Sequence, residues 1–177
     1  MLPPAMDSYF DRSGFRLSHL CWLLGAASGL FALGIGDDRR GAPVLLRLGV
    51  EFAVAAFVGD FLGFGSTALI GAHWLTKILS VFWIVAVINS FNMLDNMDAL
   101  SGGVAAIIAA SMAMVMLTTP SPGSTEPQLF VAGLLLSVCG SLLGFLWHNR
   151  QPARIWMGDG GRCLVGFLVA VGRLMET

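Results

Sequence analysis

Six long apolar runs, separated by short polar connections, make up most of the chain. A helix needs about 20 predominantly apolar residues to cross the hydrocarbon core of a bilayer, and the longer runs approach that length. Only 12% of the residues are charged, against roughly 25% in an ordinary soluble domain. The pattern predicts an all-α integral membrane protein with about six transmembrane helices. The expected spans are Leu17–Ile35, Pro43–Gly59, Trp74–Ile88, Gly102–Thr118, Gln128–Trp147 and Arg162–Leu174.

The domain organisation follows from these runs. Residues 1–16 form a polar N-terminal segment, and residues 17–177 are expected to form one polytopic transmembrane domain without an internal repeat or linker. A nucleic-acid partner is not expected, because the net charge is only −1 and binding to nucleic acid favours a basic protein.

The connections between the runs predict which side of the membrane each one faces. If all six runs span, the first, third and fifth connections share one face, and most of the arginines lie in or beside them. These arginines are Arg39, Arg40, Arg47, Arg150, Arg154 and Arg162. Loops rich in Lys and Arg stay on the cytoplasmic side of a membrane, so this face is expected to be cytoplasmic.

Acidic residues gather in the same three connections. They are Asp37, Asp38, Asp95, Asp98 and Asp159. Clustered carboxylates repel one another unless a cation lies among them. Mg²⁺ prefers oxygen ligands from one or two carboxylates, completed by substrate phosphates, and guanidinium groups suit phosphate oxygens. The pattern therefore predicts a metal-dependent site for a phosphorylated substrate at the membrane surface.

Several of these charged residues also have structural explanations. Asp37 and Asp38 could solvate a loop, although the helix macrodipole disfavours negative charge at a helix C-terminus. Asp98 precedes an apolar run, so it is also expected to serve as a helix N-cap. Glu51 lies within the second expected span and is predicted to pair with Arg47, one helical turn earlier.

Two further features of the polar connections point to a binding site. Asn92 and Asp95 share one face if the third run continues as a helix, and so could point together into a site. Trp156 lies three residues before Asp159 in the fifth connection. Its ring suits either stacking on a nucleobase or anchoring at the membrane interface.

Three motifs, in order and at alternate connections, give the chain a family resemblance. They are "GIGDDRRG", "NSFNMLDNMDALSGG" and "NRQPARIWMGDGGRCLVGF". The chain resembles the polyprenyl-phosphate N-acetylhexosamine-1-phosphate transferases (glycosyltransferase family 4, MraY/WecA-like). The likeness covers the chain from about Leu17 to its end, and the succession of the three motifs is more specific than any one of them.

The resemblance implies a reaction and its partners. A sugar 1-phosphate, expected to be GlcNAc 1-phosphate, passes from a UDP-sugar to undecaprenyl or another polyprenyl phosphate, and UMP is released. The implied product serves cell-envelope polysaccharides such as lipopolysaccharide. The implied cofactor is Mg²⁺, with Mn²⁺ as an alternative, and a homodimer is compatible with the resemblance. The implied location is the bacterial inner (cytoplasmic) membrane, with the active site facing the cytoplasm.

The resemblance also implies roles for individual residues. The catalytic pair is Asp37 and Asp38, of which one acts as a base towards the lipid phosphate or as a nucleophile in a two-step scheme. The implied metal ligands are Asp159 and Asp98. The residues implied in substrate binding are Asn92, Asp95, Trp156, Arg154 and Arg162.

The chain also departs from the family pattern. Asn96 and Ala99 replace glycines, Arg162 replaces a serine, and a later His-rich loop is absent from this sequence. The chain is therefore expected to be the middle of a longer enzyme. Three alternatives stay open: a non-catalytic fragment of such an enzyme, a UDP-MurNAc-pentapeptide donor, and, ranked last, an ion or proton transporter.

Overall fold

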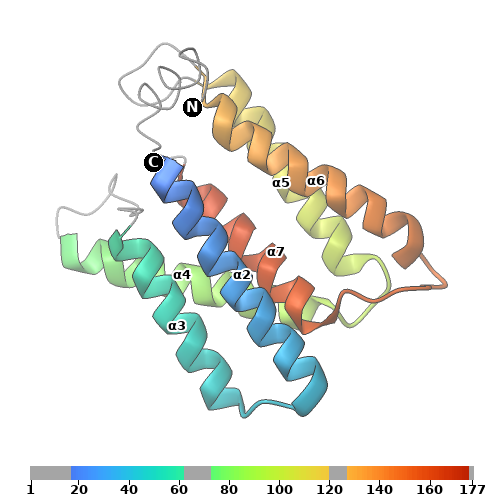
Figure 1. Cartoon of the computed structure of the whole chain (residues 1–177). Coiled ribbons are helices and arrows are strands. Elements are labelled where there is room, and N and C mark those ends of the chain that lie inside the picture. Colours follow the sequence, from blue (N-terminus) through green and yellow to red (C-terminus); the bar gives the residue numbers. More distant parts are fainter. Residues whose placement is uncertain (1–16, 62–72, 120–126, 176–177) are drawn as a thin grey trace.

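The described part of the chain is built from α-helices. The computed structural model describes residues 17–61, 73–119 and 127–175 (Figure 1). These residues form six helices and no β-sheet. The helices are α2 (Leu17–Arg40), α3 (Val44–Phe61), α4 (His73–Leu94), α5 (Leu100–Thr118), α6 (Leu129–Asn149) and α7 (Gly158–Leu174). The expected polar segment, residues 1–16, lies outside the described residues.

Each expected span lies within, or almost coincides with, one helix. In the described residues, α2, α4, α5 and α6 are long and apolar enough to cross a membrane. The other two helices are not among these candidates, because α3 carries three charged residues, Arg47, Glu51 and Asp60, and α7 has only 17 residues. The prediction of an all-α integral membrane protein is confirmed.

Helix α7 lies at the centre of the bundle. It packs most extensively against α2 and α4 and also contacts α5 and α6. Figure 1 shows α5 and α6 as an antiparallel pair on one side, with α2 and α3 on the other. The largest buried side chains around α7 include Phe167 of α7, Leu30 of α2 and Ile88 of α4. In a bilayer such side chains stabilise the bundle mainly through close van der Waals packing, because the surrounding lipid is also apolar.

Glycines allow α7 to approach its neighbours closely. A Cβ on Gly34 of α2 would lie 2.4 Å from the Cα of Gly160, and a Cβ on Gly166 would lie 2.8 Å from the Cα of Ile88. No larger residue fits at these two crossings unless the backbones separate. The crossing at Gly34 brings the end of α2 beside the start of α7.

A tight turn joins α2 to α3. Gly41 adopts a left-handed conformation with φ of 65°, and its N–H donates to the carbonyl oxygen of Asp37 at 2.8 Å. Glycine is favoured in this position after a helix because it has no Cβ to clash. The carbonyl oxygen of Pro43 then accepts the N–H groups of Leu46 and Arg47 and so begins α3.

The structure corrects one expectation about the third connection. Asp98 is not the N-cap of α5, because Ala99 takes that position with φ of 62° and no side chain caps the helix. The Asp98 carboxylate instead accepts the N–H of Ala153, from the connection between α6 and α7, at 3.1 Å. Contact between the two connections therefore turns this side chain away from the helix that follows it.

Candidate functional site

The ends of α2 and α7 meet through two of the motif aspartates. The N–H of Asp159 donates to both carboxylate oxygens of Asp38, at 3.0 and 3.1 Å. The N-terminus of α7 begins at Gly158, and the partial positive charge of a helix N-terminus attracts a carboxylate. Gly158 has φ of 65°, and a Cβ there would lie 2.8 Å from Oδ2 of Asp38. Glycine at this position therefore allows the contact between Asp38 and α7.

The other aspartate of the pair is held on both of its oxygens. Oδ1 of Asp37 accepts the N–H of Ala42 at 2.6 Å, and Oδ2 lies 3.1 Å from Nη1 of Arg47. The Asp37 carboxylate is mostly buried, whereas Asp38 is exposed. The two neighbouring acids thus have different surroundings: Asp37 has a fixed orientation, and Asp38 faces both α7 and solvent.

Arg162 connects the third connection to the start of α7. Its Nη2 lies 2.5 Å from Oδ1 of Asp159, and its Nε lies 3.5 Å from Oδ2 of Asp95. Nε also donates to the carbonyl oxygen of Gly158 at 3.1 Å. The guanidinium therefore joins acids from two of the three motifs.

Carboxylates crowd around Asp159. Its pKa is raised, first because the side chain is partly buried and further because the carboxylates of Asp38 and Asp37 lie nearby. The guanidinium groups of Arg162 and Arg47 oppose this shift. A further cation placed at this point would be attracted by the same group of acids.

The donor set suits a metal that is shared with a substrate. Among the described residues, no group of three or more His, Cys, Asp or Glu side chains is arranged to hold a metal ion on its own. Mg²⁺ is usually held by one or two carboxylates and completed by water and substrate phosphates. The neighbouring carboxylates of Asp38 and Asp159 fit that mode. The role of Asp98 as a metal ligand stays a prediction. One oxygen of its carboxylate, Oδ2, accepts the N–H of Ala153.

The predicted substrate-binding residue Asn92 lies near the end of α4. Both polar atoms of its side chain are buried and lack a well-formed hydrogen bond in the described structure, where the amide has only a weak contact with the Cys163 thiol. An unpaired buried amide costs about 1–3 kcal/mol. Such a cost is expected where the amide serves a ligand.

The predicted residues of the fifth connection are open to solvent. Trp156 is 73% exposed, and the side chain of Arg154 is also exposed. The backbone N–H of Arg154 donates to the carbonyl oxygen of His148 at 2.9 Å, which folds the connection back on the end of α6. Both side chains are therefore accessible to a ligand that approaches from this end of the bundle.

Sequence reasoning missed the role of Asn149, the last residue of α6. Its side chain is almost completely buried, accepts the N–H of Ala99 at 2.9 Å and donates to the carbonyl oxygen of Ile155 at 2.7 Å. The amide thus ties the third connection to the fifth. Two signals could have pointed to it, because this amide ends a long apolar run and is also the first residue of the third motif.

The predicted pair of Arg47 and Glu51 is confirmed, with 3.4 Å between Nε and Oε1. The sequence did not predict that Arg47 also reaches Asp37. That second contact depends on the turn between α2 and α3, which returns the chain beside the end of α2 (Figure 1).

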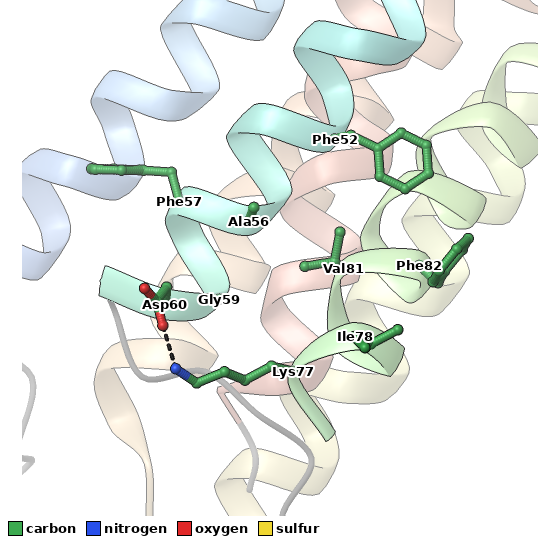
Figure 2. Close-up of a pocket in the computed structure, with 9 residues that line it drawn as sticks. All are labelled: Phe52, Ala56, Phe57, Gly59, Asp60, Lys77, Ile78, Val81 and Phe82. Atoms are coloured by element: carbon green, nitrogen blue, oxygen red, sulfur yellow. Dashed lines mark hydrogen bonds and ion pairs between the residues drawn. The ribbon is translucent and has the colours of Figure 1, made fainter. Parts of the chain in front are cut away.

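An apolar groove lies between α3 and α4, away from these acids. Figure 2 shows Phe52, Phe57 and Phe82 among its lining residues. Asp60 and Lys77 form an ion pair at one end of the groove. Asp60 lies at the end of α3 and Lys77 in the first turns of α4. The groove therefore lies towards the end of α3 and α4 that is opposite to the candidate site.

Comparison with known proteins identifies the family. A model of glycosyl transferase family 4 matches residues 20–176, which is most of the chain. The chain belongs to glycosyl transferase family 4. The matched residues include all three acidic connections of this chain.

Curated relatives give the resemblance more detail. A probable undecaprenyl-phosphate N-acetylglucosaminyl 1-phosphate transferase of Bacillus subtilis is 26% identical over 200 residues, covering 97% of this chain and 54% of the relative. A phospho-N-acetylmuramoyl-pentapeptide-transferase of Limosilactobacillus reuteri is 36% identical over 118 residues, covering 66% of this chain and 34% of the relative. The chain thus spans about half the length of the first relative and a third of the second.

Proposed function

We propose that this chain transfers an N-acetylhexosamine 1-phosphate from a UDP-sugar to undecaprenyl or another polyprenyl phosphate. The proposed sugar is GlcNAc. The observation that carries the proposal is the contact between Asp38 and the N–H of Asp159. It joins the first and third motifs at one end of the helices, where a lipid phosphate at the membrane surface can meet a soluble nucleotide. The arginine-rich connections support a cytoplasmic orientation for this end.

The proposed reaction is a displacement at phosphorus. An oxygen of the lipid phosphate attacks the β-phosphorus of the UDP-sugar and forms the new P–O bond. The bond from that phosphorus to the oxygen bridging the two phosphates breaks, and UMP leaves with this oxygen. Phosphoryl transfer depends mainly on positioning and on neutralisation of charge, and both can be supplied by side chains at this site.

The two aspartates at the end of α2 are assigned different tasks. Asp37, which Ala42 and Arg47 hold in one orientation, is assigned as the base that receives the remaining proton of the lipid phosphate. Asp38 faces α7 and Asp159, which suits the diphosphate and metal side of the site. In the two-step alternative, the Asp37 carboxylate would attack phosphorus itself, and isolation of a phosphorylated chain would distinguish the two schemes.

The remaining predicted residues are assigned to the donor. The exposed ring of Trp156 stacks on the uracil, and Asn92 and Asp95 hold polar groups of the nucleotide or sugar. Arg154 and Arg162 bind phosphate oxygens, and Arg162 exchanges its carboxylate partners for the diphosphate when the donor binds. Mg²⁺, held by Asp38 and Asp159 with the substrate phosphates, would neutralise charge on the diphosphate and favour departure of UMP.

The test is UMP release by the purified chain in detergent. The reactions contain undecaprenyl phosphate, Mg²⁺ and either UDP-GlcNAc or UDP-MurNAc-pentapeptide, and controls omit the lipid, the metal or the donor. The proposal expects lipid- and Mg²⁺-dependent UMP with UDP-GlcNAc, and its loss in Asp159→Asn. A folded chain that releases no UMP with either donor would contradict it, whereas release only with the second donor would correct the sugar.

A non-catalytic membrane role is the second candidate. The observation that favours it is the placement of Arg162 between Asp95 and Asp159, where a guanidinium already neutralises the acids. Arg162→Ser discriminates between the two functions. The catalytic proposal expects UMP release to fall in this variant, because a phosphate-binding group is lost, whereas the non-catalytic role expects no UMP from either protein.

A further inference from the structure

A fully buried carboxylate lies between α3 and α4, and the proposed reaction gives it no task. The side chain of Glu51 is 0% exposed. Nδ2 of Asn89 in α4 donates to its Oε2 at 2.5 Å, and Nε of Arg47 lies 3.4 Å from its Oε1. Oε2 is therefore hydrogen-bonded, whereas Oε1 accepts no hydrogen bond among the described residues and is paired with Arg47 through charge alone. A buried charge is retained only where it is paired, so the ion pair with Arg47 is needed to keep this carboxylate ionised.

Arg47 shares its guanidinium between two carboxylates. Nε faces Glu51, and Nη1 faces Asp37 at 3.1 Å. The guanidinium is planar and rigid, so fixing the Nε edge also fixes the direction of Nη1. With only 22% of its side chain exposed, Arg47 is held by the protein and is not free to follow a ligand.

Asn89 anchors this arrangement to α4. Its Nδ2 also donates to the carbonyl oxygen of Val85 in the preceding turn, at 2.9 Å. A continuous series of contacts therefore runs from α4 through Glu51 of α3 and Arg47 to Asp37 of α2. These contacts link three helices to one side chain of the candidate site.

We infer that Glu51, supported by Asn89, is a positioning residue that holds Arg47 in the orientation that presents Asp37 to the lipid phosphate. The inference rests on the proposed function, because it needs Asp37 to face the reacting phosphate. Arg47 acts within the protein and is not a phosphate ligand. Glu51 acts on the reaction only through Arg47.

The first test separates orientation from binding. Glu51→Gln keeps the volume and an acceptor for Asn89 but removes the charge that attracts Arg47. The expected result is a fall in kcat of about tenfold, since small misplacements of a reacting group are costly, with KM for both substrates within twofold. Ser90→Ala is the matched control, because the exposed Ser90 hydroxyl contacts only the Ala86 carbonyl of its own helix in the described structure. An unchanged kcat in Glu51→Gln would overturn the inference.

The second test does not depend on activity. The rate at which arginine Nε–H protons exchange with water is measured by ¹H–¹⁵N NMR of the chain in detergent micelles. The Arg47 signal is identified by its loss in Arg47→Lys. The expected result is a slowly exchanging Arg47 Nε–H that exchanges at least tenfold faster in Glu51→Gln and is unchanged in Ser90→Ala. Absence of a protected signal, or no change in Glu51→Gln, would overturn the inference.

Asn89→Ala supplies a second variant if Glu51→Gln does not fold. It keeps both charges of the pair and removes only the anchor to α4, so the Arg47 Nε–H is expected to exchange faster in it as well. If the wild-type chain makes no UMP but the protected signal depends on Glu51, the positioning contact stands and the proposed function fails. The two failures are therefore distinguishable.

Discussion

Replacement of Gly34 by alanine is expected to separate the two halves of the candidate site. The new Cβ would lie 2.4 Å from both the Cα and N of Gly160 and 2.6 Å from the carbonyl carbon of Asp159. Carbon atoms that are not bonded pack at about 3.5–4.0 Å, so α2 and α7 must move apart by about 1 Å or more. The neighbouring atoms are backbone, which cannot rotate away as a side chain could.

That displacement would break the hydrogen bonds from the Asp159 N–H to Asp38. They measure 3.0 and 3.1 Å, and a lengthening of about 1 Å takes them beyond bonding range. Overpacking costs about 1–3 kcal/mol, and loss of a hydrogen bond to a charged group costs about 1.5–3 kcal/mol. The helix propensity of alanine offsets about 1 kcal/mol of this cost, so Gly34→Ala is expected to lower the free energy of unfolding by about 1.5–5 kcal/mol.

The assay combines thermal unfolding in detergent with UMP release. Gly36→Ala in the same helix is the matched control, because a Cβ there would meet nothing within 4 Å. Alanine stabilises a helix by about 1 kcal/mol relative to glycine. The control is therefore expected to be at least as stable as the wild type and fully active. A Gly34→Ala protein as stable and active as Gly36→Ala would refute the close crossing of α2 and α7.

Three further predictions follow from other contacts of the site. Gly158→Ala is expected to destabilise the chain and abolish UMP release, because its Cβ would lie 2.8 Å from Oδ2 of Asp38. Gly41→Ala is the control, because Gly41 has the same φ of 65° but open space around it. In thermal unfolding, this control should lower the free energy of unfolding by only about 1–2 kcal/mol. Asn149→Ala removes two buried hydrogen bonds and should lower the free energy of unfolding by about 1–3 kcal/mol for each group left unpaired; unchanged thermal unfolding would count against the tie between the connections. Trp156→Ala should raise KM for the UDP-sugar about 5- to 150-fold at unchanged stability, because the ring is exposed and base stacking contributes about 1–3 kcal/mol; an unchanged KM would exclude stacking.

The sequence predicted the helices and the clustering of acids because both depend on local patterns. Apolar length indicates a membrane helix, and alternation of connections places three motifs at one end. The pair of Arg47 and Glu51 was predictable for the same reason, because residues four apart share a helix face.

Contacts between distant segments were not predictable in this way. The bond from the Asp159 N–H to Asp38 joins residues 121 positions apart and depends on the crossing at Gly34, which no local pattern signals. The N-cap expected at Asp98 was wrong because the local preference was overridden by contact with the connection between α6 and α7.

The central claim is that the carboxylates of α2 and α7 form one site. Electron paramagnetic resonance of Mn²⁺, used in place of Mg²⁺, tests it most directly, by titration of the chain in detergent with UDP-GlcNAc present. The account predicts saturable Mn²⁺ binding that is at least tenfold weaker in both Asp38→Asn and Asp159→Asn, and unchanged in Asp60→Asn at the opposite end of the bundle. Binding that is lost in only one of the two site variants, or that is equally affected by Asp60→Asn, would contradict a shared site.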